Sequence, residues 1–98
     1  MTTATLTRPA RILLADDLPL FRRAIAALID EQEDLQVVGE AANGVEAVEL
    51  AQRLQPDIVV LDVEMPVMDG IAAARLLRES LPACRVVMPT EPDRKRAP

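Results

Sequence analysis

Three aspartates follow two apolar segments of the chain, at points where buried strands could end. Asp62 comes directly after the run Ile58–Leu61, and the pair Asp16-Asp17 comes directly after the run Ile12–Ala15. Parallel α/β sheets bind their ligands at the carboxyl ends of the strands. If these two strands are neighbours, three carboxylates meet at one edge of one sheet. Such a group would be a site for a hard cation, with a nucleophile inside it.

Packing three carboxylates together has a cost that a divalent cation removes. At separations of about 4 Å and an effective dielectric constant of about 20, each pair repels by about 4 kcal/mol. Oxygen ligands with retained water molecules suit Mg²⁺, or Mn²⁺ in its place. A carboxylate such as Asp62 can also attack a phosphoryl group and form an aspartyl-phosphate, while the metal neutralises charge on the transferring group.

The composition argues against several other kinds of site. The 98 residues suffice for one small domain, and half of them are hydrophobic. The chain has no histidine, one cysteine (Cys84) and one aromatic residue (Phe21), which excludes histidine chemistry, cysteine-based metal sites and base stacking. A net charge of −5 argues against a nucleic-acid surface. No segment resembles a membrane span or a signal peptide, so a cytoplasmic protein is expected.

The elements that must position the aspartates alternate along the chain. Short apolar runs predict strands at 11–15, 35–40, 58–61 and 85–88. Helical spacing of apolar residues predicts a helix from 19 to about 31–34, one from 43 to the break at 56–57, and one at 71–81. This alternation implies a parallel sheet with right-handed crossovers. The run 58–61 is uniformly apolar, which predicts a strand covered on both faces.

The sequence also predicts the faces and ends of these elements. Asn43 is expected to cap the second helix, with Glu46 reaching back as its capping-box partner. Residues 1–10 are expected to be a flexible lead-in, and the proline-rich, charged residues 91–98 a disordered tail. Arg22 and Arg23 are expected to face outward from the first helix. Its packed face is expected to consist of Leu20, Phe21, Ala24, Ile25, Leu28 and Ile29.

Taken together, these pieces resemble the receiver domain of two-component response regulators. The resemblance covers residues 11–90 and rests on Asp16-Asp17, Asp62, the loop Met65-Pro66…Asp69-Gly70 and Thr90 after the fourth strand. It implies a flavodoxin-like (CheY-like) α/β fold, a three-layer parallel sheet with helices on both faces. The segments 11–17 and 39–47 are most similar to receivers of the LuxR/NarL type, which carry a helix-turn-helix output domain and regulate transcription.

The resemblance implies a role for each matching residue. Asp62 would accept a phosphoryl group from the phosphohistidine of a sensor histidine kinase. Asp17 and Asp62 would bind Mg²⁺ through their side chains, Asp16 would position a metal-bound water, and Glu64 would offer its backbone carbonyl. Thr90 would hydrogen-bond the phosphoryl group. The residues expected to serve turn geometry and helix entry in the loop are Pro66, Asp69 and Gly70.

The chain departs from the family's pattern towards its C-terminus. Receivers have five strands and five helices, whereas four strands and three helices are predicted here. The family's lysine at the end of the fifth strand has no counterpart, and Lys95 lies inside the charged tail. A truncated domain would leave the fourth strand as an exposed edge, which predicts marginal stability or self-association.

Three functions of different classes stay open. The first is a phosphoacceptor signalling module that is not itself an enzyme. The second is an aspartate-nucleophile phosphohydrolase of the haloacid-dehalogenase type, although such enzymes have Asp-x-Asp where this chain has Asp16-Asp17-Leu18. The third is a degenerate or truncated receiver that serves as a non-phosphorylated interaction module, or a gene fragment. The purely structural alternatives are that Asp16 and Asp17 are helix caps and that Asp62 is a turn residue. Without a helix-turn-helix, no direct contact with nucleic acid is expected.

Overall fold

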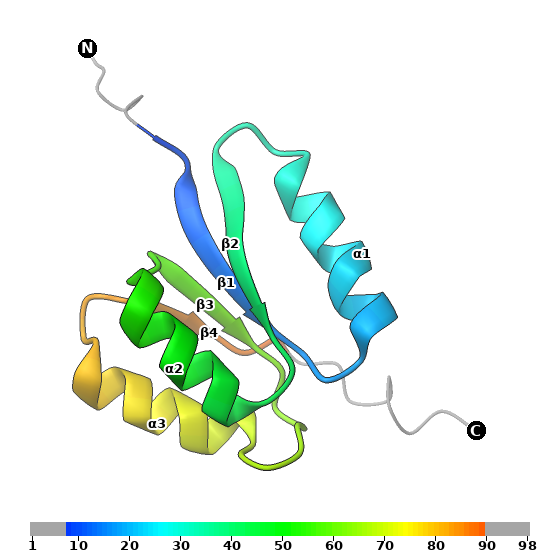
Figure 1. Ribbon diagram of the computed structural model, residues 1–98. Coiled ribbons are helices and arrows are strands. Elements are labelled where there is room, and N and C mark those ends of the chain that lie inside the picture. Colours follow the sequence, from blue (N-terminus) through cyan, green and yellow to red (C-terminus); the bar gives the residue numbers. More distant parts are fainter. Residues whose placement is uncertain (1–7, 90–98) are drawn as a thin grey trace.

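The computed structural model describes residues 8–89, which alternate between strand and helix (Figure 1). The predicted order and type of the elements are confirmed. Residues 1–7, Thr90 and the predicted tail at 91–98 lie outside the described residues. The elements are β1 (Ala10–Ala15), α1 (Pro19–Asp30), β2 (Leu35–Ala41), α2 (Gly44–Leu54), β3 (Ile58–Leu61), α3 (Gly70–Ser80) and β4 (Arg85–Val87).

The four strands form one parallel sheet in the order β2-β1-β3-β4. In Figure 1, α1 lies on one face of this sheet, and α2 and α3 lie on the other. The fold is therefore a three-layer, flavodoxin-like α/β arrangement, as the sequence predicts. Because all strands run in the same direction, the carboxyl ends of β2, β1 and β3 meet at one edge.

β2 has one residue more than the stretch of β1 with which it pairs. Ile12 pairs with Val37, but Leu13 pairs with Gly39, so Val38 occupies a register shift between the two pairs. Beyond the shift the ladder runs on to the pair of Ala15 and Ala41. An extra residue of this kind is a β-bulge, which bends the strand and increases its twist.

The main core lies between the sheet and the helices α2 and α3. Its largest fully buried side chains are Leu13, Val59, Leu61 and Leu77. The two helices meet the sheet and each other largely through alanines, which lets their backbones approach closely. Burying each leucine or valine in this layer contributes about 1.5–3 kcal/mol. The alanines in this layer are Ala47, Ala51, Ala73 and Ala74.

α1 packs through only part of the predicted face, since Phe21, Ile25 and Ile29 are half-buried as expected while the other predicted members are exposed. Leu20 is 86% exposed and Leu28 is 57% exposed, whereas Ala26 is buried. Arg22, which was expected to face outward, is half-buried. The prediction is wrong for Leu20, Leu28 and Arg22 because apolar residues extend around much of α1, so spacing alone does not fix the limits of the face that packs.

β3 is fully covered on one face only. Val59 and Leu61 are buried against the core, while Ile58 and Val60 on the other face are only partly buried. The prediction of full burial on both faces is therefore wrong for the part of the chain that the structure describes. The physical reason is that α1, the one described helix on that face, lies over β2 and β1 (Figure 1).

The prediction that Asn43 caps α2 is confirmed, and Glu46 reaches back as expected but to the N–H of Ala42, one residue before the cap. Asn43 Oδ1 accepts a hydrogen bond from the Glu46 N–H at 2.9 Å, and Glu46 Oε1 accepts one from the Ala42 N–H at 2.8 Å. The other end of α2 has a partner that the sequence did not reveal. At the C-terminus, Arg11 Nη1 donates to the carbonyl oxygens of Leu54 at 2.8 Å and Gln55 at 3.0 Å. Arg11 therefore ties β1 to the end of α2, where a cation is favoured by the helix dipole.

Asp57 holds the same end of the sheet together and makes it sensitive to acid. Its Oδ2 accepts a hydrogen bond from the Arg11 N–H at 2.7 Å, and Arg8 Nη1 lies 3.2 Å from the same oxygen. The Arg11 N–H lowers the pKa of Asp57 below its ordinary value, and the Arg8 guanidinium lowers this pKa further, while partial burial opposes both. A lowered folded-state pKa stabilises the fold above the unfolded-state pKa, and this contribution disappears as the pH falls through the folded-state pKa.

We therefore expect the urea midpoint of the wild type to fall between about pH 5 and about pH 3 by more than that of Asp57→Asn. The amide keeps an acceptor for the Arg11 N–H but loses the titrating proton. Asp34→Asn, at an exposed turn, is the matched control and should follow the wild type. Identical pH profiles for the wild type and Asp57→Asn would contradict this prediction.

Candidate functional site

The structure brings Asp16, Asp17 and Asp62 together at the carboxyl edge of the sheet. Each residue offers one carboxylate oxygen, and these three oxygens lie within 4.8 Å of one another. Asp16 is buried, with 5% of its surface exposed, and Asp17 and Asp62 are half-buried. Two neighbouring strands supply them, since β1 pairs directly with β3.

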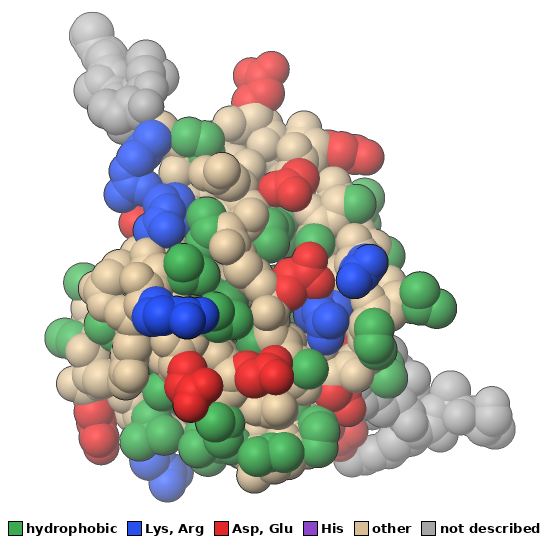
Figure 2. All heavy atoms as spheres, viewed as in Figure 1, with side chains coloured by type: hydrophobic (Ala, Val, Ile, Leu, Met, Phe, Trp, Pro, Cys, Tyr) green, Lys and Arg blue, Asp and Glu red, His purple; other side chains and the backbone are tan. Residues whose placement is uncertain are grey.

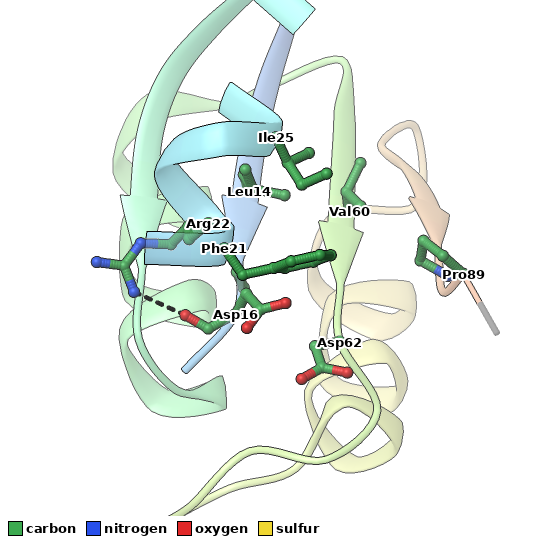
Figure 3. A pocket seen from close by; sticks show the side chains of 9 residues that line it. Leu14, Asp16, Phe21, Arg22, Ile25, Val60, Asp62 and Pro89 are labelled. Carbon is green, nitrogen blue, oxygen red and sulfur yellow. Dashed lines mark hydrogen bonds between the residues drawn. The ribbon is translucent and has the colours of Figure 1, made fainter. Parts of the chain in front are cut away.

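The end of β1 holds Asp16 through both its backbone and its side chain. The Asp16 N–H donates to the Ala41 carbonyl oxygen at 3.0 Å, which continues the ladder between β1 and β2. Asp16 Oδ1 accepts a hydrogen bond from the Leu18 N–H at 2.9 Å, and Arg22 Nη1 donates to the Asp16 carbonyl oxygen at 2.7 Å (Figure 3).

The same contacts argue against the helix-cap alternative for the first acidic pair. Leu18 is the N-cap residue of α1, and it makes no side-chain capping hydrogen bond. The Asp16 side chain instead closes a local turn with the residue two positions ahead, as aspartates in loops often do.

Asp62 is held from β1 on one side and from the start of α3 on the other. Its N–H donates to the Ala15 carbonyl oxygen at 3.0 Å. The Gly70 N–H donates to the Val63 carbonyl oxygen at 2.9 Å, which brings the first residue of α3 against the backbone of Asp62. A Cβ at position 70 would collide with the Asp62 carbonyl oxygen, so this approach requires glycine.

The loop between β3 and α3 docks against the start of α2. The Gly44 N–H donates to the Met68 carbonyl oxygen at 2.8 Å, and a Cβ at Gly44 would collide with that oxygen. The loop turns sharply at Val67, whose φ is 68°, with a hydrogen bond of 2.7 Å from the Met68 N–H to the Pro66 carbonyl oxygen. A non-glycine residue in this left-handed region costs about 1–2 kcal/mol.

The other predicted loop residues lie around this turn. Pro66 and Glu64 are exposed, and Asp69 Oδ1 caps α3 by accepting a hydrogen bond from the Ala72 N–H at 2.9 Å. Two apolar side chains of this region are exposed, Val67 at 82% and Ile71 at 50%. Figure 2 shows exposed hydrophobic side chains gathered along the lower border of the molecule. Thr90, which was expected to hydrogen-bond a phosphoryl group, lies outside the described residues.

A cavity of about 110 Å³ lies beside the acidic cluster, on the α1 side of the sheet. Figure 3 shows Asp16 and Asp62 at one end of this cavity and Phe21 reaching from α1 towards β3. Because its other walls are mostly apolar, charges at this end act in a medium of lower dielectric constant than water. The remaining side chains that line it are Leu14, Ala15, Arg22, Ile25, Val60 and Pro89.

Sequence reasoning missed Arg22 and Gly44 as parts of this site. Arg22 lies on the half-buried face of α1, and its spacing of four residues from the buried Ala26 is the signal that could have placed it there. The sequence marks Gly44 only as a residue at the start of the second helix. Its contact with Met68 joins segments far apart in the sequence, and no local pattern reports it.

The donor set of the cluster fits a hard divalent cation. The three candidate ligand groups are all carboxylates, whose oxygens favour Mg²⁺, Ca²⁺ or Mn²⁺ over softer metals. Three such charges within 4.8 Å repel one another unless a cation or a positive side chain compensates them. The geometry therefore supports metal binding next to a carboxylate that lies at the tip of a strand.

Sheet order, loop docking and the acidic cluster together define the receiver class of signalling domains. A family model described as "Response regulator receiver domain" matches residues 12–97, and the chain belongs to this family. Among solved structures, it is similar to the response regulator domain of Thermotoga maritima CheB, with a TM-score of 0.79 and 42% identity over 83% of this chain and 60% of that one.

Two further structures extend the comparison. The signal receiver domain of the putative response regulator NarL from Mycobacterium tuberculosis has a TM-score of 0.80 and 35% identity, over 88% of this chain and 72% of that one. The CheX-CheY-BeF3-Mg complex from Borrelia burgdorferi has a TM-score of 0.76 and 32% identity, over 83% of this chain and 61% of the matched one.

Curated relatives are much longer than this chain. One is a protein-glutamate methylesterase/protein-glutamine glutaminase from Photobacterium profundum, 49% identical over 74% of this chain and 18% of its own length. The chain spans about a fifth of the length of the curated relatives it matches. Similarity to both CheB and NarL establishes the receiver family but does not single out the LuxR/NarL subfamily that the sequence suggested.

Among the described helices, none has the length and apolar character that a membrane crossing requires.

Proposed function

We propose that this chain is a cytoplasmic receiver module that accepts a phosphoryl group on Asp62 from a sensor histidine kinase, in a reaction that depends on Mg²⁺. The observation that carries the proposal is the approach of three carboxylate oxygens to within 4.8 Å at the tips of β1 and β3. A similar structure, the CheX-CheY-BeF3-Mg complex, contains magnesium and BeF3, which supports the same kind of chemistry for this chain.

In this proposal each acidic residue has a separate task. A carboxylate oxygen of Asp62 attacks phosphorus, and a P–O bond forms as the bond from phosphorus to the donor's imidazole nitrogen breaks, with the electron pair leaving on that nitrogen. Asp17 and Asp62 hold Mg²⁺ through their side chains, Asp16 positions a water, and Glu64 offers its carbonyl oxygen. Bound Mg²⁺ supplies neutralising charge for the phosphoryl group. We propose Thr90 as a hydrogen-bond donor to that group.

A receiver that binds partners without being phosphorylated is the second candidate, and the convergence of the three carboxylates disfavours it. The phosphohydrolase alternative is not proposed, because the family match covers nearly the whole chain. The enzyme activity in the names of the curated relatives belongs to proteins of which this chain matches about a fifth.

Acetyl phosphate tests the proposal without knowledge of the kinase. The chain is incubated with acetyl phosphate and Mg²⁺, and intact mass and peptide mapping locate the adduct. We expect one phosphoryl group on Asp62, and we expect EDTA to prevent its formation. Turnover of phosphate esters would support the hydrolase instead, and a folded chain without an adduct would support the non-phosphorylated interaction module.

We also propose that β4 mediates self-association. It is one of the two edge strands of the described sheet, and an edge strand presents unpaired backbone groups to other chains. Val87 adds an exposed apolar side chain to this edge. Gel filtration over a range of concentrations is expected to show larger species as the concentration rises. A monomer at every concentration would argue against β4 as a contact.

A further inference from the structure

Arg22 bridges the ends of two strands beside the acidic cluster. Its Nη1 donates to the Asp16 carbonyl oxygen at 2.7 Å, and its Nε donates to Glu40 Oε1 at 2.9 Å. The side chain of Arg22 is only 14% exposed and that of Glu40 is 33% exposed. The guanidinium on α1 is therefore held at the end of β1 by the bond to Asp16, which Figure 3 shows, and at the end of β2 by Glu40.

These contacts act on the peptide that joins the first two aspartates. The Asp16 N–H is fixed by the Ala41 carbonyl oxygen of β2. The Asp16 carbonyl belongs to the peptide group shared with Asp17, and Arg22 is its hydrogen-bond donor. A rotation of this peptide group would move both carboxylates relative to Asp62, because the two side chains leave the backbone on either side of it.

We propose that Arg22, oriented by Glu40, is a positioning residue that fixes the Asp16–Asp17 peptide and thereby sets the affinity of the acidic cluster for a divalent cation. The inference rests on the proposed function, because it assigns a determinant of metal affinity to that site. Arg22 touches neither the metal nor the phosphoryl group in this scheme and acts through the backbone of Asp16.

The bridge requires arginine and not only a positive charge. The guanidinium presents Nε and Nη1 in a rigid, planar arrangement, so that it can meet the carbonyl and the carboxylate at the same time. A lysine has one nitrogen at the end of a flexible stem. Arg22→Lys therefore keeps the charge and loses the two-point geometry.

A purely electrostatic role of Arg22 and a positioning role predict opposite changes in cation affinity for Arg22→Gln. If charge alone mattered, removing a positive charge beside three carboxylates would strengthen cation binding, because less repulsion would oppose the cation. Loosening the Asp16–Asp17 peptide would weaken binding, and substitutions of outer-shell partners of metal ligands commonly lower affinity by about 10–100-fold. The direction of the change therefore separates the two causes.

The test is a titration of the whole chain with Mn²⁺, followed by electron paramagnetic resonance. We expect Arg22→Lys and Arg22→Gln each to weaken Mn²⁺ binding by about tenfold or more. The matched controls are Arg23→Lys and Arg23→Gln, at the next residue of α1, which is exposed. Their effect should stay below about twofold, because an exposed charge is screened. Unchanged or tighter binding in Arg22→Lys would overturn the inference.

A second measurement on the metal-free chain separates this inference from the proposed function. The Leu18 N–H donates to Asp16 Oδ1, so its hydrogen exchange reports how well Asp16 is held. We expect faster exchange at Leu18 in both Arg22 variants and no change in the Arg23 variants. If the wild type bound no Mn²⁺ and formed no adduct, the proposed function would fail, and exchange at Leu18 would still decide the role of Arg22. Should an Arg22 variant fail to fold, Glu40→Ala removes the acceptor of the Arg22 Nε–H, and it is expected to weaken Mn²⁺ binding and to speed hydrogen exchange at Leu18.

Discussion

Replacing Asp62 with asparagine is expected to abolish the phosphoryl adduct formed from acetyl phosphate. An amide lacks the anionic oxygen that attacks phosphorus, and the change also removes one of the three carboxylates that meet within 4.8 Å. Intact mass and peptide mapping after incubation with acetyl phosphate and Mg²⁺ measure the result. Because the reaction needs this one oxygen, the loss should be complete and not partial.

Asp34→Asn is the matched control, since it makes the same chemical change at an exposed turn just before β2. This turn lies at the opposite end of the strands from the acidic cluster. It should form the adduct to the same extent as the wild type. Urea denaturation of Asp62→Asn shows whether the fold survives the substitution. An adduct that persists in folded Asp62→Asn would assign the acceptor role to another residue and remove the basis of the proposed function.

Gly70→Ala is expected to lower the free energy of unfolding by about 3 kcal/mol. The added Cβ would collide with the carbonyl oxygen of Asp62, so either the start of α3 or the end of β3 must move. Alanine is the better helix former by about 1 kcal/mol, which does not offset a collision between two backbone segments. Because the backbone of Asp62 is one of the two sides, Mn²⁺ affinity should fall together with stability.

Gly39→Ala provides the comparison for this prediction. A Cβ at Gly39 would meet Leu54 Cδ1 at 2.9 Å, which is the end of a flexible side chain that can turn away. Urea denaturation of both variants is expected to show a clearly smaller loss for Gly39→Ala and no effect of that change on Mn²⁺ binding. Equal losses of unfolding free energy in the two variants would mean that the close contact between Gly70 and the Asp62 backbone does not determine the loss of stability.

The sequence predicts the order of elements well because each short apolar run is bounded by a local signal. Pro19 begins α1, Asn43 caps α2, and Pro56 follows its end, and each of these acts on its immediate neighbours. The acidic cluster is predictable for a related reason. A residue that follows a parallel strand is delivered to one edge of the sheet, whatever packs on the faces.

Other features depend on contacts that no local pattern records. The apolar residues of α1 surround the helix, so the exposure of Leu20 and the partial burial of Arg22 depend on how α1 lies across β2 and β1. Arg11 at the end of α2 joins segments more than forty residues apart. The contact of Gly70 with Asp62 likewise appears only when α3 has folded back against β3.

The extra residue in β2 ties the shape of that strand to the chemistry at the carboxyl ends of the strands. Removing Val38 would leave the residue pairs on both sides of the bulge matched. It would also take out the bend and the additional twist that a bulge gives to a strand. The end of β2, which carries Glu40 and the Ala41 carbonyl oxygen that accepts from the Asp16 N–H, would then change direction relative to β1. A deletion on a strand that supplies none of the three carboxylates would thus displace two of the contacts around Asp16.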